Sequence, residues 1–212
     1  MPRTLMCFGD SNTHGSPPIV TRGVYARFDA DTRWPCVARA ALGPDWVLVE
    51  EGLPGRTAQF PDLMMGDHMD GSMGLKIALN SHGPVDVMTL MLGTNDTKTR
   101  FGATPAQITA GLAGLLDYAL GDEMQTRHDG FKVLLICPPP VLEQGPIKDE
   151  FWGARATSLA LPPLYAALAA ARGAGFLDAG RVIAVSPVDG VHYEAAAHRV
   201  LGAAVAAAVA GL

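Results

Sequence analysis

Three residues in distant parts of the sequence carry side chains that could perform nucleophilic catalysis. Ser11 lies in the glycine-bearing segment 9–15, directly after an apolar run, and its hydroxyl could attack an electrophile once a base removed its proton. Asp189 and His192 are three residues apart, a spacing that puts both side chains on one side of a helical turn. The carboxylate could hold one imidazole nitrogen while the other accepts the serine proton. We therefore take Ser11, His192 and Asp189 as a candidate catalytic triad.

Each of these residues also has an ordinary structural explanation. Serine often caps a helix, so segment 9–15 taken alone would favour a cap over a nucleophile. Asp189 could likewise cap the helix expected after it, with His192 on the helix surface. The other histidines have no such carboxylate at helical spacing toward the same edge and are expected to line the site or lie at the surface: His14, His68, His82, His128 and His198.

Asn95 lies in segment 93–96, which follows the longest apolar run. Its side-chain amide could stabilise the negative oxygen that develops on a substrate carbonyl, and the loss of such a donor costs about 2.7–4 kcal/mol. The structural alternative is an Asx-turn that shapes the loop. Asp96 is expected to be structural, because a carboxylate directed at that oxygen would oppose catalysis.

Alternating strands and helices must bring these segments together. Continuous apolar runs predict buried strands at 4–8, 46–50, 85–92, 132–137 and 175–178. Helices are expected at 33–42, 104–119, 149–172 and 194–209. Pro162 and Pro163 must break, kink or restart the third of these helices. Residues 52–74 have no hydrophobic period and are expected to form a long loop.

This pattern predicts an α/β fold, a three-layer α/β/α sandwich with a central parallel sheet in one domain over residues 1–212. Ligands of such sheets bind beyond the carboxyl ends of the strands. The loops that share this edge are expected to begin at Gly9, Glu51, Gly93 and Ala179. Ser11, Asn95 and His192 should therefore meet there.

Composition and charge exclude several classes of protein. Of the 212 residues, 49% are hydrophobic and 17% are charged, which is typical of a globular protein. The net charge of −5, with 16 scattered lysines and arginines, argues against nucleic acid as a partner. Three cysteines are too few for a disulfide framework, and no apolar segment is long enough to cross a membrane. We therefore expect a cytoplasmic protein.

Four segments together resemble the sequence blocks of the SGNH, or GDSL-type, hydrolase family. Gly9-Asp10-Ser11 is similar to the first block, with Asn12 where leucine is common. The second, third and fifth blocks are matched by segments 51–57, 93–96 and 189–192. The matches occur in family order and cover nearly the whole chain. The resemblance implies a flavodoxin-like SGNH hydrolase fold.

The resemblance also implies an oxyanion hole and a reaction. The hole would consist of the backbone N–H groups of Ser11 and Gly55 and the Asn95 side chain. Several further segments are similar to the small arylesterase/acyltransferase branch: 7–11, 27–28, 33–34, 50–53, 91–98 and 176–180. Members of that branch act on short acyl esters, some transfer the acyl group to alcohols, and some form oligomers. His14 and Ser16 stand where tryptophans can line the entrance in that branch, a departure that bears on substrate range.

Neighbours of the triad are expected to line the substrate pocket, namely Asn12, Thr94, Lys98 and Val191. Segments 52–74 and 138–153 could act as lids. The methionines of the first segment either pack beneath the loop or form part of a homo-oligomer interface: Met64, Met65, Met69 and Met73. The expected partner is a small-molecule ester, and the serine mechanism needs no metal or organic cofactor.

Two other functions are compatible with parts of the sequence. A metal-dependent phosphoesterase could use the oxygen and nitrogen ligands Asp10, His14, Asn95, Asp189 and His192. No His-x-His or paired-carboxylate spacing supports it. A non-catalytic phosphate-binding module could use segment 9–15 at a helix N-terminus, although this segment lacks the Gly-Lys-Ser/Thr ending of a nucleotide loop.

Overall fold

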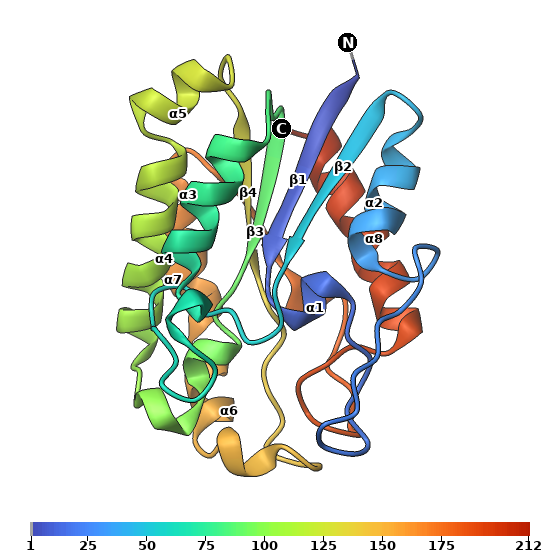
Figure 1. Cartoon of the computed structure of the whole chain (residues 1–212), viewed down its shortest axis with the longest axis vertical. Helices are drawn as coiled ribbons and strands as arrows, with labels where there is room; N and C mark the ends of the chain where they lie inside the picture. The colour runs from blue at the N-terminus through green and yellow to red at the C-terminus, as the bar shows by residue number, and fades with distance from the viewer. Residues whose placement is uncertain (1) are drawn as a thin grey trace.

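The computed structural model describes residues 2–212 and places five parallel strands at the centre of the protein (Figure 1). The strands are β1 (Arg3–Gly9), β2 (Trp46–Gly52), β3 (Val87–Met91), β4 (Lys132–Cys137) and β5 (Gly175–Asp178). Their order across the sheet is β2-β1-β3-β4-β5. In the register of β1, Cys7 pairs with Glu50 on one side and Thr89 on the other. The predicted parallel sheet is confirmed.

Helices cover both faces of this sheet, as Figure 1 shows. One face packs against α3 (Gly71–Ser81), α4 (Pro105–Ala119) and α7 (Leu161–Ala171). The other face packs against α2 (Trp34–Leu42) and α8 (Ala195–Ala210). Three helices are shorter: α1 (Ser11–His14), α5 (Asp122–Arg127) and α6 (Ala154–Leu159). The expected three-layer α/β/α arrangement is therefore confirmed.

The inner strands are buried on both faces. Because side chains alternate along a strand, Met6 and Phe8 of β1 pack toward α3, α4 and α7. Leu5 and Cys7 pack toward α2 and α8 instead. Every residue of β3 is buried as well. This explains why these strands have continuous apolar sequences rather than an alternating pattern.

Helix α3 was not predicted, and it begins inside the segment expected to be a loop. Asp70 caps it by accepting a hydrogen bond from the backbone N–H of Ser72 at 2.9 Å. Glycines at 71 and 74 lower the helix propensity of its first turn, which obscures the helix in the sequence. Gly71 is needed because a Cβ there would lie 2.5 Å from the carbonyl oxygen of Thr57.

The helical region expected over 149–172 is divided, as the two prolines required. It consists of a 3₁₀ turn at Lys148–Glu150, then α6, then α7. Pro162 and Pro163 lie in the first turn of α7. Backbone N–H groups in a first turn have no acceptor within the helix, so proline loses no hydrogen bond there. The two prolines therefore mark the start of a new helix, α7.

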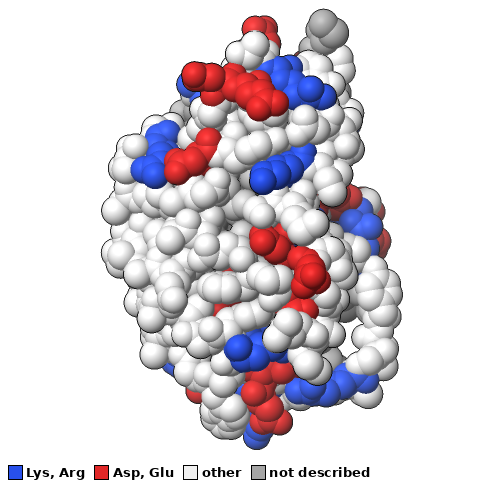
Figure 2. All heavy atoms as spheres, turned by 60° about the vertical axis from the view of Figure 1, so that its left-hand side comes forward, with Lys and Arg blue, Asp and Glu red and all other residues white. Residues whose placement is uncertain are grey.

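The methionines of segment 52–74 have different environments. Met69 is only 4% exposed and packs in the interior, whereas Met64 is 80% and Met73 is 51% exposed. The molecular face that includes α3 and α4 carries charges of both signs in small mixed groups, with a broad uncharged area between them (Figure 2). Among the described helices, none has the length and apolar character required to cross a lipid bilayer.

Gly202 allows α8 to pack closely against α2. A Cβ at this position would lie 2.6 Å from the Cβ of Val37 and 2.9 Å from the carbonyl oxygen of Trp34. We expect Gly202→Ala to lower the free energy of unfolding by about 1–3 kcal/mol, because the helices must move apart. Gly114→Ala in α4 is the control, since no atom lies within 4 Å of the added Cβ. Urea denaturation that gives equal stability for both variants would contradict the prediction.

Candidate active site

Ser11 is the first residue of α1, just beyond the carboxyl end of β1. The helix cap is Asp10, whose carboxylate accepts a hydrogen bond from the backbone N–H of Asn12 at 2.9 Å. The capping role considered for Ser11 is thus taken by its neighbour. The serine side chain instead faces His192, with 3.0 Å between Oγ and Nε2.

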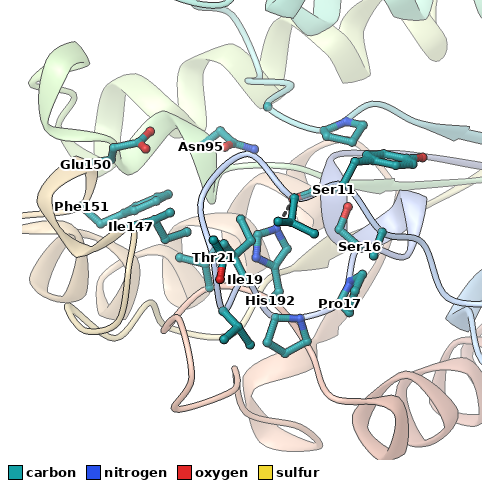
Figure 3. Close-up of a pocket in the computed structure, with 18 of the residues that line it drawn as sticks. Ser11, Ser16, Pro17, Ile19, Thr21, Asn95, Ile147, Glu150, Phe151 and His192 are labelled. Carbon is teal, nitrogen blue, oxygen red and sulfur yellow. Dashed lines mark hydrogen bonds between the residues drawn. The ribbon is translucent and has the colours of Figure 1, made fainter.

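Ser11, His192 and Asp189 form one hydrogen-bonded series, of which Figure 3 shows Ser11 and His192. Nδ1 of His192 lies 2.6 Å from Oδ2 of Asp189. All three residues are buried, with Ser11 the most exposed at 7%. In this geometry a carboxylate fixes the orientation of an imidazole, and the imidazole can accept a hydroxyl proton.

Asp189 also organises the backbone around the imidazole. Its Oδ1 accepts hydrogen bonds from the backbone N–H groups of Val191 and His192 at 3.0 and 2.9 Å. Its Oδ2 accepts another from the backbone N–H of Ile19 at 2.7 Å. Burial alone would raise the pKa of Asp189, but the hydrogen bonds and the charge of His192 outweigh burial, and the net pKa is lowered. The carboxylate is therefore ionised at neutral pH.

The expected helical turn at 189–192 is instead a tight turn outside any helix. Helix α8 begins later, at Ala195, with Glu194 as its N-cap. Gly190 adopts a left-handed backbone conformation with φ of 75°, and a Cβ there would overlap the carbonyl oxygen of Leu142. The carboxylate and imidazole still meet, because the turn bends both side chains to the same side.

Ser11 and His192 line a cavity of about 430 Å³ (Figure 3). In the view of Figure 3, Ser16 and Pro17 lie at one end, and Glu150 and Phe151 at the other. Segment 16–26 supplies much of the lining. Apart from Ser16, which was expected near the entrance, no residue of this segment was predicted to line the site, because its Pro- and Gly-containing sequence has no regular pattern.

The four expected pocket residues fall into two groups. Lys98 and Val191 line the cavity, whereas Asn12 and Thr94 lie outside its lining. The Asn12 amide donates to the carbonyl oxygen of Val191 at 3.2 Å. The Thr94 carbonyl accepts from the Thr97 hydroxyl at 2.6 Å. Both residues therefore support the loops rather than contact the cavity.

The three expected oxyanion-hole residues, Ser11, Gly55 and Asn95, all line this cavity. The Asn95 amide nitrogen lies 3.1 Å from the carbonyl oxygen of Arg56 and 3.5 Å from the carboxylate of Asp10. Since an amide nitrogen carries two hydrogens, one can remain with Arg56 while the other meets a substrate oxygen. Gly55 has φ of 94°, and a Cβ there would lie 2.5 Å from Cε of Met65.

Arg56 is a buried cation next to these donors, and no pattern in the sequence indicated that it would lie there. Its guanidinium donates to the carbonyl oxygens of Gly9, at 3.0 Å, and of Glu51, and it lies 4.0 Å from the ring centroid of Phe8. Burial lowers its pKa to about 10. The side chain thus ties together the loops that leave β1 and β2.

Two buried carboxylates lie beside the candidate oxyanion hole. Burial raises the pKa of Asp10 to about 6. Burial, together with the nearby charge of Asp10, raises the pKa of Asp96 to about 7. Oδ1 of Asp96 accepts a hydrogen bond from the backbone N–H of Ala58 at 2.8 Å, and Oδ2 has no partner among residues 2–212. Asp96 therefore shapes the loop at a cost in desolvation.

The expectation for the remaining histidines was wrong at two positions. His128 and His198 are buried, at 2% and 0% exposure, because their rings fill interior positions and bond to backbone groups. Burial lowers the pKa of His198 to about 4. His14 instead bonds to the hydroxyl of Tyr25 at 2.7 Å, at the edge of the cavity.

The geometry bears on the two alternative functions. Among residues 2–212, no three His, Cys, Asp or Glu side chains are placed so that they could hold a metal ion together. The N-terminus of α1 already receives the carboxylate of Asp10, and a bound phosphate would face that charge. No specific contact favours either alternative.

Comparisons with known proteins give a family model and several solved structures. The model of the GDSL-like lipase/acylhydrolase family matches residues 7–200. Est24, a carbohydrate acetylesterase from Sinorhizobium meliloti, is 36% identical, with 99% of each chain covered and a TM-score of 0.93. The aryl esterase of M. smegmatis is also 36% identical over 99% of each chain, with a TM-score of 0.92. A search of curated proteins found no match.

Asp96 should make stability depend on pH. Its pKa rises from 3.8 to about 7 on folding, so the folded protein keeps a proton that the unfolded chain loses. The contribution of Asp96 to the free energy of unfolding must therefore fall as pH rises from about 4 to about 7. Asp96→Asn removes this titration, so its stability relative to the unsubstituted protein should improve across that range.

Thermal unfolding at several pH values measures this difference. Asp45→Asn, at an exposed position, is the matched control for the loss of one carboxylate. A stability difference for Asp96→Asn that stays constant with pH would contradict the prediction.

Proposed function

The chain belongs to the GDSL-like lipase/acylhydrolase family, and on this basis we propose that it is a serine esterase acting through Ser11, His192 and Asp189. The family resemblance predicted from the sequence is confirmed by the match over residues 7–200. The observation that carries the catalytic proposal is the buried hydrogen-bonded series that connects Asp189 to the Ser11 hydroxyl at the cavity.

In the first half of the proposed reaction, Oγ of Ser11 attacks the carbonyl carbon of the ester. Nε2 of His192 accepts the hydroxyl proton as the new C–O bond forms. Asp189 holds Nδ1–H of the ring, which fixes the tautomer and stabilises the imidazolium. This arrangement generates the nucleophile without a metal.

The negative oxygen of the tetrahedral intermediate is stabilised by the backbone N–H groups of Ser11 and Gly55 and by the Asn95 amide. The intermediate then collapses, and His192 donates its proton to the departing alcohol. Water, or a second alcohol, attacks the acyl-enzyme with His192 again as the base. The first half releases the alcohol of the ester, and the second half gives either a carboxylic acid or a new ester.

Acetyl and other short acyl esters are the proposed substrates. Solved relatives at 36% identity are described as a carbohydrate acetylesterase and an aryl esterase, which supports this class. The cavity of about 430 Å³ must also hold both the acyl group and the alcohol, so a long acyl chain competes with the alcohol for space. Its largely apolar wall supports acyl transfer, because an apolar surface favours an alcohol over water.

The homo-oligomer expected from the sequence stays a prediction. It is supported by exposed apolar side chains on the long loop and α3, where Leu63 is 94%, Met64 80% and Ile77 66% exposed. Exposed apolar side chains that form a contiguous patch often mark an interface between copies. Met65, in contrast, lines the cavity and is accounted for by the site itself. The exclusion of nucleic acid and the cytoplasmic location stay predictions as well.

Ser11→Ala should abolish esterase activity, with a loss of at least about 10³-fold in kcat/KM, because the nucleophile is removed. A fluorophosphonate probe should label the unsubstituted protein at Ser11, as mapped by mass spectrometry, and should not label the variant. Ser81→Ala, at an exposed position in α3, is the labelling control. Activity should survive a chelator. Full esterase activity in Ser11→Ala would overturn the proposed mechanism.

Substrate preference can be measured with para-nitrophenyl acetate, butyrate and octanoate. We expect kcat/KM to be highest for acetate and to decrease with chain length, because the cavity is shared with the alcohol group. Added butanol should yield butyl acetate beside acetic acid. A maximum at octanoate would contradict the short-ester proposal, and the absence of butyl acetate would contradict acyl transfer.

A further inference from the structure

Lys98 is a buried lysine in the wall of the cavity that the reaction described above does not use. It is 5% exposed and lines the same cavity as Ser11. Its Nζ lies 3.8 Å from Sδ of Met65 and 6.0 Å from the ring centroid of Phe151. Both of these neighbours also line the cavity. The ammonium group is therefore held at the cavity surface between a thioether and an aromatic ring.

Two of the carboxylates that act on Lys98, Asp62 and Glu150, are bound to arginines. Arg100 bonds to Asp62 at 2.5 Å and to Glu150 at 3.1 Å, and Arg22 lies 3.3 Å from the other oxygen of Glu150. Two carboxylates are thus matched by two guanidinium groups. Within residues 2–212, no carboxylate forms an ion pair with Lys98. Lys98 thus has no carboxylate in ion-pair contact, although the charges of Glu150, Asp62 and Asp10 favour its charged form from a distance.

An unpaired buried ammonium is costly, because it gives up water without gaining comparable hydrogen bonds. Lysine has three N–H donors, and the thioether of Met65 is a weak acceptor for one of them. Burial lowers the pKa of Lys98, and the positive charge of Arg100 lowers it further. A negative group placed in the cavity would stabilise the charged form of Lys98 and supply hydrogen-bond acceptors for its N–H groups.

We propose that Lys98 binds a carboxylate of the substrate, so that the enzyme prefers esters that carry a negative charge apart from the ester group. This inference rests on the proposed esterase function and specifies its substrate class. The acid group belongs either to the acyl part or to the alcohol part of the ester. Both arrangements place the carboxylate against the same ammonium group.

The surroundings favour a carboxylate over a phosphate. A phosphate dianion is usually held by several donors at once, whereas this wall offers a single ammonium beside the apolar Met65 and Phe151. Glu150 lines the same cavity, and its charge would oppose a second negative charge on the ligand. A single ammonium group with three N–H donors therefore suits one carboxylate.

Two pairs of isosteric esters test this preference. For the acyl side, monoethyl succinate is compared with its neutral analogue ethyl succinamate. For the alcohol side, para-acetoxybenzoate is compared with para-acetoxybenzamide. Within each pair only the charge changes, so the ratio of kcat/KM for acid over amide reports charge recognition. We expect this ratio to be about tenfold or more in at least one pair, as for one charge-assisted hydrogen bond.

Lys98→Met keeps the length of the side chain and removes its charge. The favourable ratio should fall toward one in this variant, and using a ratio cancels any loss that is common to both esters. Lys76→Met, at an exposed position in α3, removes the same charge elsewhere and should keep the ratio of the unsubstituted protein.

Each outcome decides the inference separately from the esterase proposal. Hydrolysis of neutral esters by the unsubstituted protein, with no preference for the acid in either pair, would overturn the role of Lys98 and leave the esterase intact. This comparison stands even where Lys98→Met does not fold. A preference that persists in Lys98→Met would also overturn it. Failure to hydrolyse any ester, with no probe on Ser11, would instead refute the esterase proposal.

Discussion

The carboxylate of Asp189 is the group on which the rest of the site depends. One oxygen holds the imidazole of His192 and the backbone of Ile19, and the other holds the turn that carries the imidazole. A single ionised side chain thus orients the base, fixes its loop and anchors the cavity wall. Because its hydrogen bonds outweigh the cost of burial, the pKa of Asp189 is lowered and the charge persists in the interior.

The parallel sheet makes this convergence possible. The carboxyl ends of neighbouring strands meet at one edge, so Ser11 after β1 and Asn95 after β3 lie side by side although they are far apart in sequence. Close approach needs glycine at Gly52, where a Cβ would lie 2.2 Å from the backbone nitrogen of His14. Arg56 then ties the loops together from below. Close backbone packing and one buried side chain therefore hold this edge together.

Buried charge is the common electrostatic feature of the site. Asp10 and Asp96 have raised pKa values, and Arg56 and Lys98 have lowered ones, in each case chiefly because of burial. Asp10 and Arg56 bond to backbone groups of the loops, so their cost is partly offset. Lys98 lines the cavity, and its ammonium bonds to no backbone group of the described residues. Asp10 and Arg56 thus stabilise the loops, whereas Lys98 is available to a ligand.

The sequence alone predicted the five strands, most of the long helices and the candidate site residues Ser11, Asn95, Asp189 and His192, because apolar periodicity and local motifs are properties of neighbouring residues. Helix α3 was missed because glycines weaken its local signal, and it forms because its apolar face packs on the sheet. Only the tertiary structure decided that segment 16–26 lines the cavity, that Arg56 bonds to the loops after β1 and β2, and that Lys98 has no ion partner among the described residues. These features arise from contacts between residues distant in the chain, and no local pattern encodes such contacts.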